Sequence, residues 1–171
     1  MAVLPIIKIG HPTLRKIAER VNKIDQDLKD FVDNLIETMR LNEGVGLAAT
    51  QVNVVKQVFV IDKGLIDEAW EIQVYINPEI LESEGLENLE EGCLSIPGIR
   101  AEVERPPAIK VKYQNLDGKL IEEQLEGMLA KVFQHEFDHL NGVLFVDRIP
   151  QLIRKLLEPQ IKEIEGEYTY Q

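Results

Sequence analysis

Two histidines four residues apart give the first indication of chemistry in this chain. His135 and His139 flank Glu136 in the segment FQHEFDHLNG, residues 133–142. On a helix, residues four apart lie on one face, so both imidazoles can bind one metal ion, and Glu136 lies close enough to take a proton from water. A catalytic metal usually has three protein ligands, so we expect a third one elsewhere in the chain.

The third ligand has three candidates. The extended motif HExxHxxGxxH is excluded, because Phe145 stands where its last histidine would be. Glu158 would make the protein a metallopeptidase, but it lies among several acids that are typical of a solvated surface. Cys93 offers a thiolate, and a Cys-His-His set with an open fourth position is a catalytic site for zinc or ferrous iron.

Two other uses of these residues remain as alternatives. If Cys93 were a nucleophile with a histidine base, the second histidine and Glu136 would have no role. A structural zinc site would need a fourth ligand, such as His11 or a carboxylate, and would also give Glu136 no task. The hydrolytic metal centre uses all four residues at once.

The composition of the chain restricts the possible partners. With 19 basic and 30 acidic residues, the 171-residue chain has a formal net charge of −11. This charge argues against binding to nucleic-acid backbones and to anionic membrane surfaces. A single cysteine cannot form an internal disulfide, so we expect a reducing compartment. We also expect no signal peptide and no membrane span.

Hydrophobic spacing predicts the elements that position these residues. The fold class is α+β, with small mixed or antiparallel sheets around a central metal-binding helix and a C-terminal helix, in one domain spanning residues 1–171. We predict a helix at 24–40 capped by Asp25, followed by strands at 57–62 and 72–77. A hairpin is predicted at 108–127, with its turn at Asp117-Gly118. The metal helix is predicted at about 124–141, ending before Gly142, and a last helix at 151–167, which Pro159 bends or interrupts. The glycines of segment 44–51 end the first helix.

Three segments together resemble a known family. GVGLAATQ (44–51), EGCLS (91–95) and QHEFDH (134–139) closely resemble, in this order and spacing, the signature motifs of peptide deformylases. HPTLR (11–15) is similar to the N-terminal segment of that family, and the length is similar to that of its short bacterial form.

The resemblance implies a reaction and its surroundings. It implies hydrolytic removal of the N-formyl group from N-formylmethionine of newly made polypeptides, with release of formate. It implies one divalent metal ion, Fe²⁺ in the cell, for which Zn²⁺, Ni²⁺ or Co²⁺ can substitute. It is also compatible with a bacterial cytoplasmic protein that contacts the ribosome transiently, without nucleic-acid specificity.

The resemblance also assigns roles to residues. Cys93, His135 and His139 are implied as metal ligands and Glu136 as the general base. The Gln51 amide and the Leu94 backbone N–H are implied as donors to the formyl oxygen. The implied substrate-binding residues are Val45, Gly46, Glu91, Arg100, Met128 and Val132, with Glu91 and Arg100 near the pocket rim. Asp138 is expected to orient a ligand or to pair with a basic residue. Lys131 places a cation near a pocket that is otherwise expected to be apolar.

Overall fold

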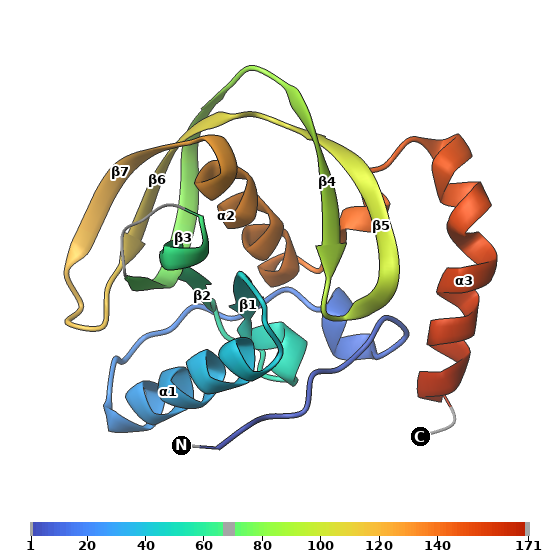
Figure 1. Ribbon diagram of the computed structural model, residues 1–171. Coiled ribbons are helices and arrows are strands. Elements are labelled where there is room, and N and C mark those ends of the chain that lie inside the picture. The colour runs from blue at the N-terminus through green and yellow to red at the C-terminus, as the bar shows by residue number, and fades with distance from the viewer. Residues whose placement is uncertain (1, 67–70, 170–171) are drawn as a thin grey trace.

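A computed structural model describes residues 2–66 and 71–169 (Figure 1). A five-stranded antiparallel sheet, in the order β1-β2-β3-β6-β7, faces a separate hairpin of β4 and β5, and α2 lies between them. The strands are β1 (Gly46–Ala48), β2 (Val58–Asp62), β3 (Ile72–Glu84), β4 (Glu87–Cys93), β5 (Ile96–Arg105), β6 (Ala108–Gln114) and β7 (Leu120–Glu126), and the α-helices are α1 (Gln26–Leu41), α2 (Gly127–Leu140) and α3 (Gln151–Thr169). The predicted α+β class, with antiparallel sheets around a central helix and a C-terminal helix, is confirmed.

Strand β3 is longer than its sequence pattern predicts. The buried run at 72–77 is only its first half, and the strand continues to Glu84. Its pairing with β6 shifts register between Ile76 and Glu79 and again between Ile80 and Glu82, and such bulges bend and twist a strand. The bent strand carries the chain over α2 toward β4 (Figure 1).

The β6–β7 hairpin is confirmed, but the predicted start of the metal helix is wrong. Gln124 and Leu125 belong to β7, where they pair with Lys110 and Ile109. The chain leaves the strand at Gly127, whose φ of 63° suits glycine because it has no Cβ. Pairing with β6 therefore takes residues that helical spacing alone had assigned to α2.

Helix α1 has the predicted cap. The Asp25 carboxylate accepts a hydrogen bond from the Leu28 backbone N–H at 3.0 Å, which satisfies one of the free donors at the start of the helix. The apolar face of α1 is buried through Leu28, Val32, Leu35 and Met39.

Helix α3 is not interrupted at Pro159, so that part of the prediction is wrong. The helix runs from Gln151 to Thr169 with Pro159 inside it. It packs beside β5 (Figure 1), and Ile161 is fully buried in a cluster that includes Ile99 and Val103 of that strand. Packing on both sides of the proline offsets the hydrogen bond that proline cannot donate.

The β4–β5 hairpin was not predicted from the sequence. From Ile99 to Arg105 the residues of β5 alternate between buried and exposed, with Ile99, Ala101 and Val103 facing the interior. This period of two is the signature of a half-buried strand. The hairpin carries Cys93 at the end of β4 and so positions one side of the site.

Candidate metal centre

Three ligating side chains meet between α2 and β4. Among the described residues, one ligand atom each from Cys93, His135 and His139 lies within 4.8 Å of the other two. The Cys93 Sγ is 3.4 Å from the His139 Nε2. Cys93 ends β4 immediately after a register shift, and both histidines project from α2. The structure thus brings together the three residues that the sequence predicted as ligands.

The other candidate ligands lie elsewhere. Glu158 is on α3, where it accepts a hydrogen bond from Arg154. His11 caps a short 3₁₀ helix and accepts the Thr13 backbone N–H through Nδ1. The Phe145 ring lies 6.1 Å from the His135 ring in a stacked arrangement. The metal-ligating group found in the described chain therefore has three members, as in a catalytic site with an open position, rather than the four of a structural zinc site.

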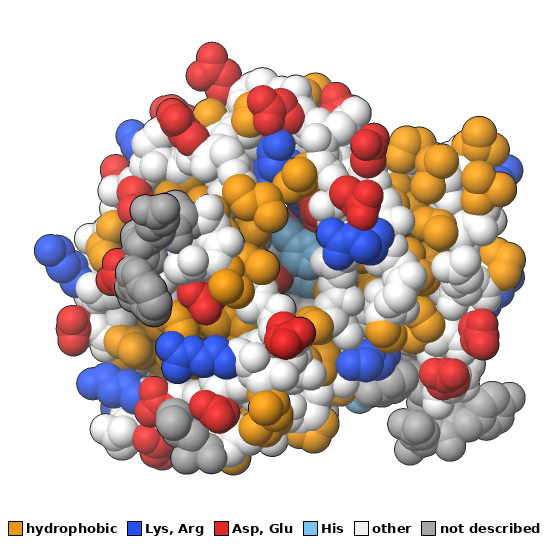
Figure 2. All heavy atoms as spheres, viewed as in Figure 1, with side chains coloured by type: hydrophobic (Ala, Val, Ile, Leu, Met, Phe, Trp, Pro, Cys, Tyr) orange, Lys and Arg blue, Asp and Glu red, His pale blue; other side chains and the backbone are white. Residues whose placement is uncertain are grey.

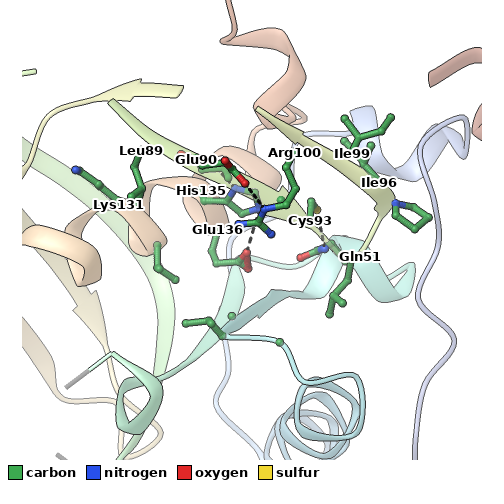
Figure 3. Close-up of a pocket in the computed structure, with 18 of the residues that line it drawn as sticks. Gln51, Leu89, Glu90, Cys93, Ile96, Ile99, Arg100, Lys131, His135 and Glu136 are labelled. Atoms are coloured by element: carbon green, nitrogen blue, oxygen red, sulfur yellow. Dashed lines mark hydrogen bonds and ion pairs between the residues drawn. The ribbon is translucent and has the colours of Figure 1, made fainter. Parts of the chain in front are cut away.

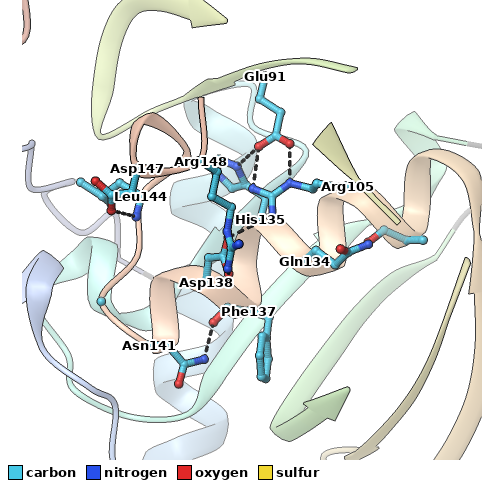
Figure 4. Close-up of polar contacts among 12 residues, drawn as sticks. Glu91, Arg105, Gln134, His135, Phe137, Asp138, Asn141, Leu144, Asp147 and Arg148 are labelled. Atoms are coloured by element: carbon cyan, nitrogen blue, oxygen red, sulfur yellow. Dashed lines mark hydrogen bonds and ion pairs between the residues drawn. The ribbon is translucent and has the colours of Figure 1, made fainter. Parts of the chain in front are cut away.

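Buried charges orient His135 (Figure 4). The His135 Nδ1 is 2.8 Å from the Glu91 carboxylate, which leaves Nε2 to face Cys93. Glu91 in turn accepts two hydrogen bonds from the Arg105 guanidinium, at 2.5 and 3.0 Å. A carboxylate on the far nitrogen of a ligating histidine fixes the ring and its tautomer. Glu91 is therefore buried behind the ligand, not at the pocket rim as expected.

Asp138 joins the hairpin to α2. Its carboxylate accepts hydrogen bonds from Arg105 at 2.9 Å and from Arg148 at 2.6 and 2.9 Å. The side chains of Arg105 and Asp138 are almost fully buried. Asp138 therefore pairs with basic residues, which was one of its two predicted roles.

The two histidines have opposite electrostatic surroundings. Burial alone would lower the pKa of His135, but its hydrogen bonds with Cys93 and Glu91 and the charges near it raise that pKa well above its ordinary value. Burial and the positive charges of His135 and Arg105 hold the pKa of His139 well below its ordinary value. His139 is thus neutral, the form that binds metals. The donor set of one thiolate and two imidazoles fits a divalent ion of the zinc or ferrous type.

Glu136 is buried beside the three ligands. Its side chain is 3% exposed, and its Oε1 lies 3.7 Å from the His135 Nε2. Burial is the main reason that the pKa of Glu136 rises to about 7. A Cβ at Gly46 would lie only 3.0 Å from the Glu136 Cγ and 3.3 Å from a Val132 methyl. Glycine at position 46 therefore allows β1 to lie directly against the acid.

Gln51 presents its amide nitrogen to the centre. Its Oε1 accepts the Ala48 backbone N–H at 3.0 Å. Its Nε2 is 3.1 Å from the Ser95 Oγ and 3.5 Å from the Cys93 Sγ. Because the oxygen is occupied on one side, the N–H₂ group must face Cys93. Ser95, which helps hold this amide, had no predicted role although it ends the EGCLS segment.

A cavity of about 490 Å³ opens onto the centre (Figure 3). Figure 2 shows a hollow in this face of the molecule, with histidine at its base and hydrophobic side chains beside it. All the predicted site residues except His139 line this cavity, namely Val45, Gly46, Gln51, Glu91, Cys93, Leu94, Arg100, Met128, Val132, His135 and Glu136. Arg100 is exposed, as expected for a rim residue, and it donates to Glu90 at 2.7 Å.

Arg105 is the main site residue that sequence reasoning missed. It is 3% exposed and contacts both Glu91 and Asp138. The available signal was its place in the alternation of β5, where it continues the buried series of Ile99, Ala101 and Val103. A charged residue at a position that alternation assigns to the interior indicates a buried ion pair.

These residues define a hydrolytic metal centre. It consists of a cysteine from the hairpin and two histidines from a buried helix, with an acid and an amide around an open cavity. The polypeptide deformylase family matches residues 3–155 of the chain. A peptide deformylase of Thermotoga maritima is 52% identical over 156 residues, covering 91% of this chain and 92% of the relative. A peptide deformylase of Saccharophagus degradans is 50% identical over 169 residues, covering 95% of this chain and 96% of the relative.

Solved structures agree with the sequence relatives. A peptide deformylase of Plasmodium falciparum superimposes with a TM-score of 0.92 at 37% identity, covering 97% of this chain and 98% of that one. The Synechococcus elongatus peptide deformylase in complex with actinonin superimposes with a TM-score of 0.86 at 42% identity, covering 92% of this chain and 87% of that one. The chain therefore belongs to the polypeptide deformylase family, a family of metal-dependent hydrolases that remove the N-formyl group from new polypeptides. Within the described residues, no helix has the length and apolar character needed to span a membrane.

Proposed function

We propose that Cys93, His135 and His139 hold one divalent ion, Fe²⁺ in the cell, with Zn²⁺, Ni²⁺ or Co²⁺ able to substitute. The observation that carries this proposal is the three-member ligand group beside a buried acid at the base of an open cavity. When bound, such an ion acts as a Lewis acid that makes water nucleophilic near neutral pH.

Glu136 is the general base. Its carboxylate takes a proton from the attacking water and passes it to the amine nitrogen as the formyl C–N bond breaks. Burial keeps the pKa of this group near 7, which suits an acid that must both accept and release a proton at neutral pH. The side chain lies directly against Gly46, where an added Cβ would come within 3.0 Å of the Glu136 Cγ.

Gln51 and Leu94 stabilise the charge that develops on the formyl oxygen. The Gln51 amide is fixed at both ends, because its Oε1 accepts the Ala48 backbone N–H and its Nε2, which faces Cys93, donates to the Ser95 Oγ. Leu94 lines the same cavity. Donors fixed before the reaction lower its barrier because they need not reorganise.

The remaining cavity residues hold the peptide. Val45 and Gly46 flank its backbone, and Met128 and Val132 line the pocket for the methionine side chain. Arg100 acts at the mouth of the cavity. Glu91 serves the substrate only indirectly, by orienting His135 through the bond at 2.8 Å.

The wider setting is also a proposal. We infer that residues 1–171 form one catalytic domain acting on N-formylmethionyl nascent peptides in a bacterial cytoplasm, with transient contact to the ribosome. The net charge of −11 supports the absence of nucleic-acid specificity.

Formate release tests the proposal directly. Protein loaded anaerobically with ferrous iron is expected to release formate from formyl-Met-Ala-Ser and no acetate from acetyl-Met-Ala-Ser, because the tight site excludes the larger acyl group. Actinonin, the ligand of the Synechococcus enzyme, is expected to block the reaction. Absence of release from folded, metal-replete protein would refute the proposal.

A further inference from the structure

The cavity contains a cation that the proposed reaction does not use. The Lys131 side chain lines the cavity together with Leu89, Met128 and Val132, yet only 8% of that side chain is exposed. Lysine side chains are almost never buried to this extent without a partner. The position of this ammonium therefore requires an explanation.

Lys131 lies on the same side of α2 as the metal ligands. It precedes His135 by four residues, so the two side chains are neighbours one turn apart. Figure 3 shows Lys131 with Leu89 at the end of the cavity away from Cys93 and Gln51. A substrate side chain that points away from the metal ligands within this cavity therefore approaches Lys131.

Strand β4 forms the facing wall of this end. Glu87, Leu89 and Glu91 share one face of β4 because side chains alternate along a strand. Glu91 contacts His135, and Glu87 contacts the Lys131 Nζ at 2.8 Å. Two acid–base pairs thus join β4 to α2, and Leu89 lies between them.

The Lys131–Glu87 pair differs from the His135–Glu91 pair because the Lys131 ammonium has further N–H groups that can donate hydrogen bonds. An ammonium has three N–H groups, and among the described residues the hydrogen bond of Lys131 goes to Glu87, whose side chain is 57% exposed. Additional acceptors can therefore reach the ammonium without breaking the ion pair. The aliphatic stem, with Leu89, Met128 and Val132, still offers an apolar surface to a plain thioether.

We propose that Lys131 is a specificity-determining residue that lets the enzyme act on peptides whose first side chain ends in a hydrogen-bond acceptor, and methionine sulfoxide in particular. This inference rests on the proposed function. A sulfoxide placed in a wholly apolar pocket loses its hydrogen bonds to water without replacement, which is costly. Here the Lys131 ammonium donates to the sulfoxide oxygen, so oxidation of the formylmethionine residue leaves the peptide a substrate.

The test compares kcat/KM for formyl-Met(O)-Ala-Ser with kcat/KM for formyl-Met-Ala-Ser, both measured on iron-loaded protein. The wild type is expected to prefer the thioether by less than about tenfold. Lys131→Met, which keeps the length of the side chain and removes its donors, is expected to increase that preference a further tenfold or more. Lys131→Arg, which keeps a cation and its donors, is expected to stay close to the wild type.

Lys29→Met on the exposed face of α1 is the matched control, and its preference should equal that of the wild type. An unchanged preference in Lys131→Met would overturn the proposal, as would strong discrimination against the sulfoxide by the wild type. If Lys131→Met does not fold, the wild type and Lys131→Arg still test the proposal. Both must show a kcat/KM for formyl-Met(O)-Ala-Ser within about tenfold of that for formyl-Met-Ala-Ser, and a larger gap in either would overturn it. Failure of the wild type on formyl-Met-Ala-Ser itself would instead refute the proposed function.

Discussion

Helix α2 and the β4–β5 hairpin both supply the metal centre, but they hold their residues in place by different means. On α2, one helical turn sets the spacing of His135, Glu136 and His139. On the hairpin, Cys93 follows a register shift at the end of β4, and buried pairs of Arg105 with Asp138 and of Glu91 with His135 join the hairpin to α2. Local helix geometry therefore sets the spacing of the residues on α2, whereas contacts between residues far apart in the sequence place the hairpin against them.

The difference predicts two kinds of failure. A substitution of a reacting group on α2 should abolish turnover while the ion stays bound. A substitution in the ion pairs that hold the hairpin against α2 should lower both the affinity for the metal ion and the stability of the fold.

Glu136→Gln should give the largest loss of activity. The amide keeps the size of the side chain but cannot accept the proton, so we expect kcat/KM to fall by about 10²- to 10⁴-fold. Metal content, measured by elemental analysis, should equal that of the wild type. Glu104→Gln, an exposed position on β5, should retain full turnover; loss of the ion from Glu136→Gln would instead make Glu136 a structural residue.

Arg105→Met should loosen the ion and the fold together. The substitution leaves the buried Glu91 carboxylate without its guanidinium partner, so we expect a loss of about 3–5 kcal/mol in the free energy of unfolding. Because His135 is then less firmly oriented, metal affinity should fall by about 10- to 100-fold. Competition with a chelator and denaturant titration measure the two quantities. Unchanged metal affinity would show that the Glu91–Arg105 pair does not position the ligand.

The same ion pair predicts a dependence of stability on pH. Burial alone would raise the pKa of Glu91, but hydrogen bonds from His135 and Arg105 and the charge of Arg105 lower it to about 2, from an ordinary value of 4.5. A carboxylate whose pKa is lower in the folded state stabilises the protein fully above its unfolded pKa. Its contribution, roughly 3 kcal/mol, should disappear as the pH falls from about 4.5 toward 2.

Denaturant titrations of metal-free protein between pH 6 and pH 3 check this dependence without interference from loss of the ion. The wild type should lose more stability over this range than Glu91→Gln, which has no carboxylate to protonate. Parallel curves for the two proteins would contradict the assignment.

Arg100→Met should give the smallest effect on stability. Arg100 and Glu90 form a pair on the same hairpin, but their side chains are 63% and 59% exposed. Exposed pairs contribute about 0–1 kcal/mol, so the free energy of unfolding should change far less than in Arg105→Met. A loss as large as that of Arg105→Met would mean that burial does not separate the two arginines.

The same contrast explains what the sequence reveals. The motif on α2 could be found because a helix places residues 135 and 139 on one face regardless of the rest of the fold. Asp25 and the turn at Asp117-Gly118 were predictable for the same reason, because capping and tight turns depend on neighbouring residues.

The contacts of the hairpin could not be found in this way. Arg105 and Glu91 are 14 residues apart and meet Asp138 on α2, 33 residues further along the chain. Only the pairing of β4 with β5, and the placement of that hairpin on α2, brings these charges together. Cys93 could be proposed as a ligand by comparing the candidate donors in the sequence, and the resemblance agreed with it, but the burial of Glu91 behind His135 needed the three-dimensional structure.

The coordination shell of zinc-loaded protein tests the central claim most directly. X-ray absorption at the zinc edge should show one sulfur at about 2.3 Å and two imidazole nitrogens at about 2.0–2.1 Å, and the sulfur should be absent in Cys93→Ala. A shell without sulfur, or one closed by four protein ligands, would contradict the shared metal centre of α2 and the β4–β5 hairpin.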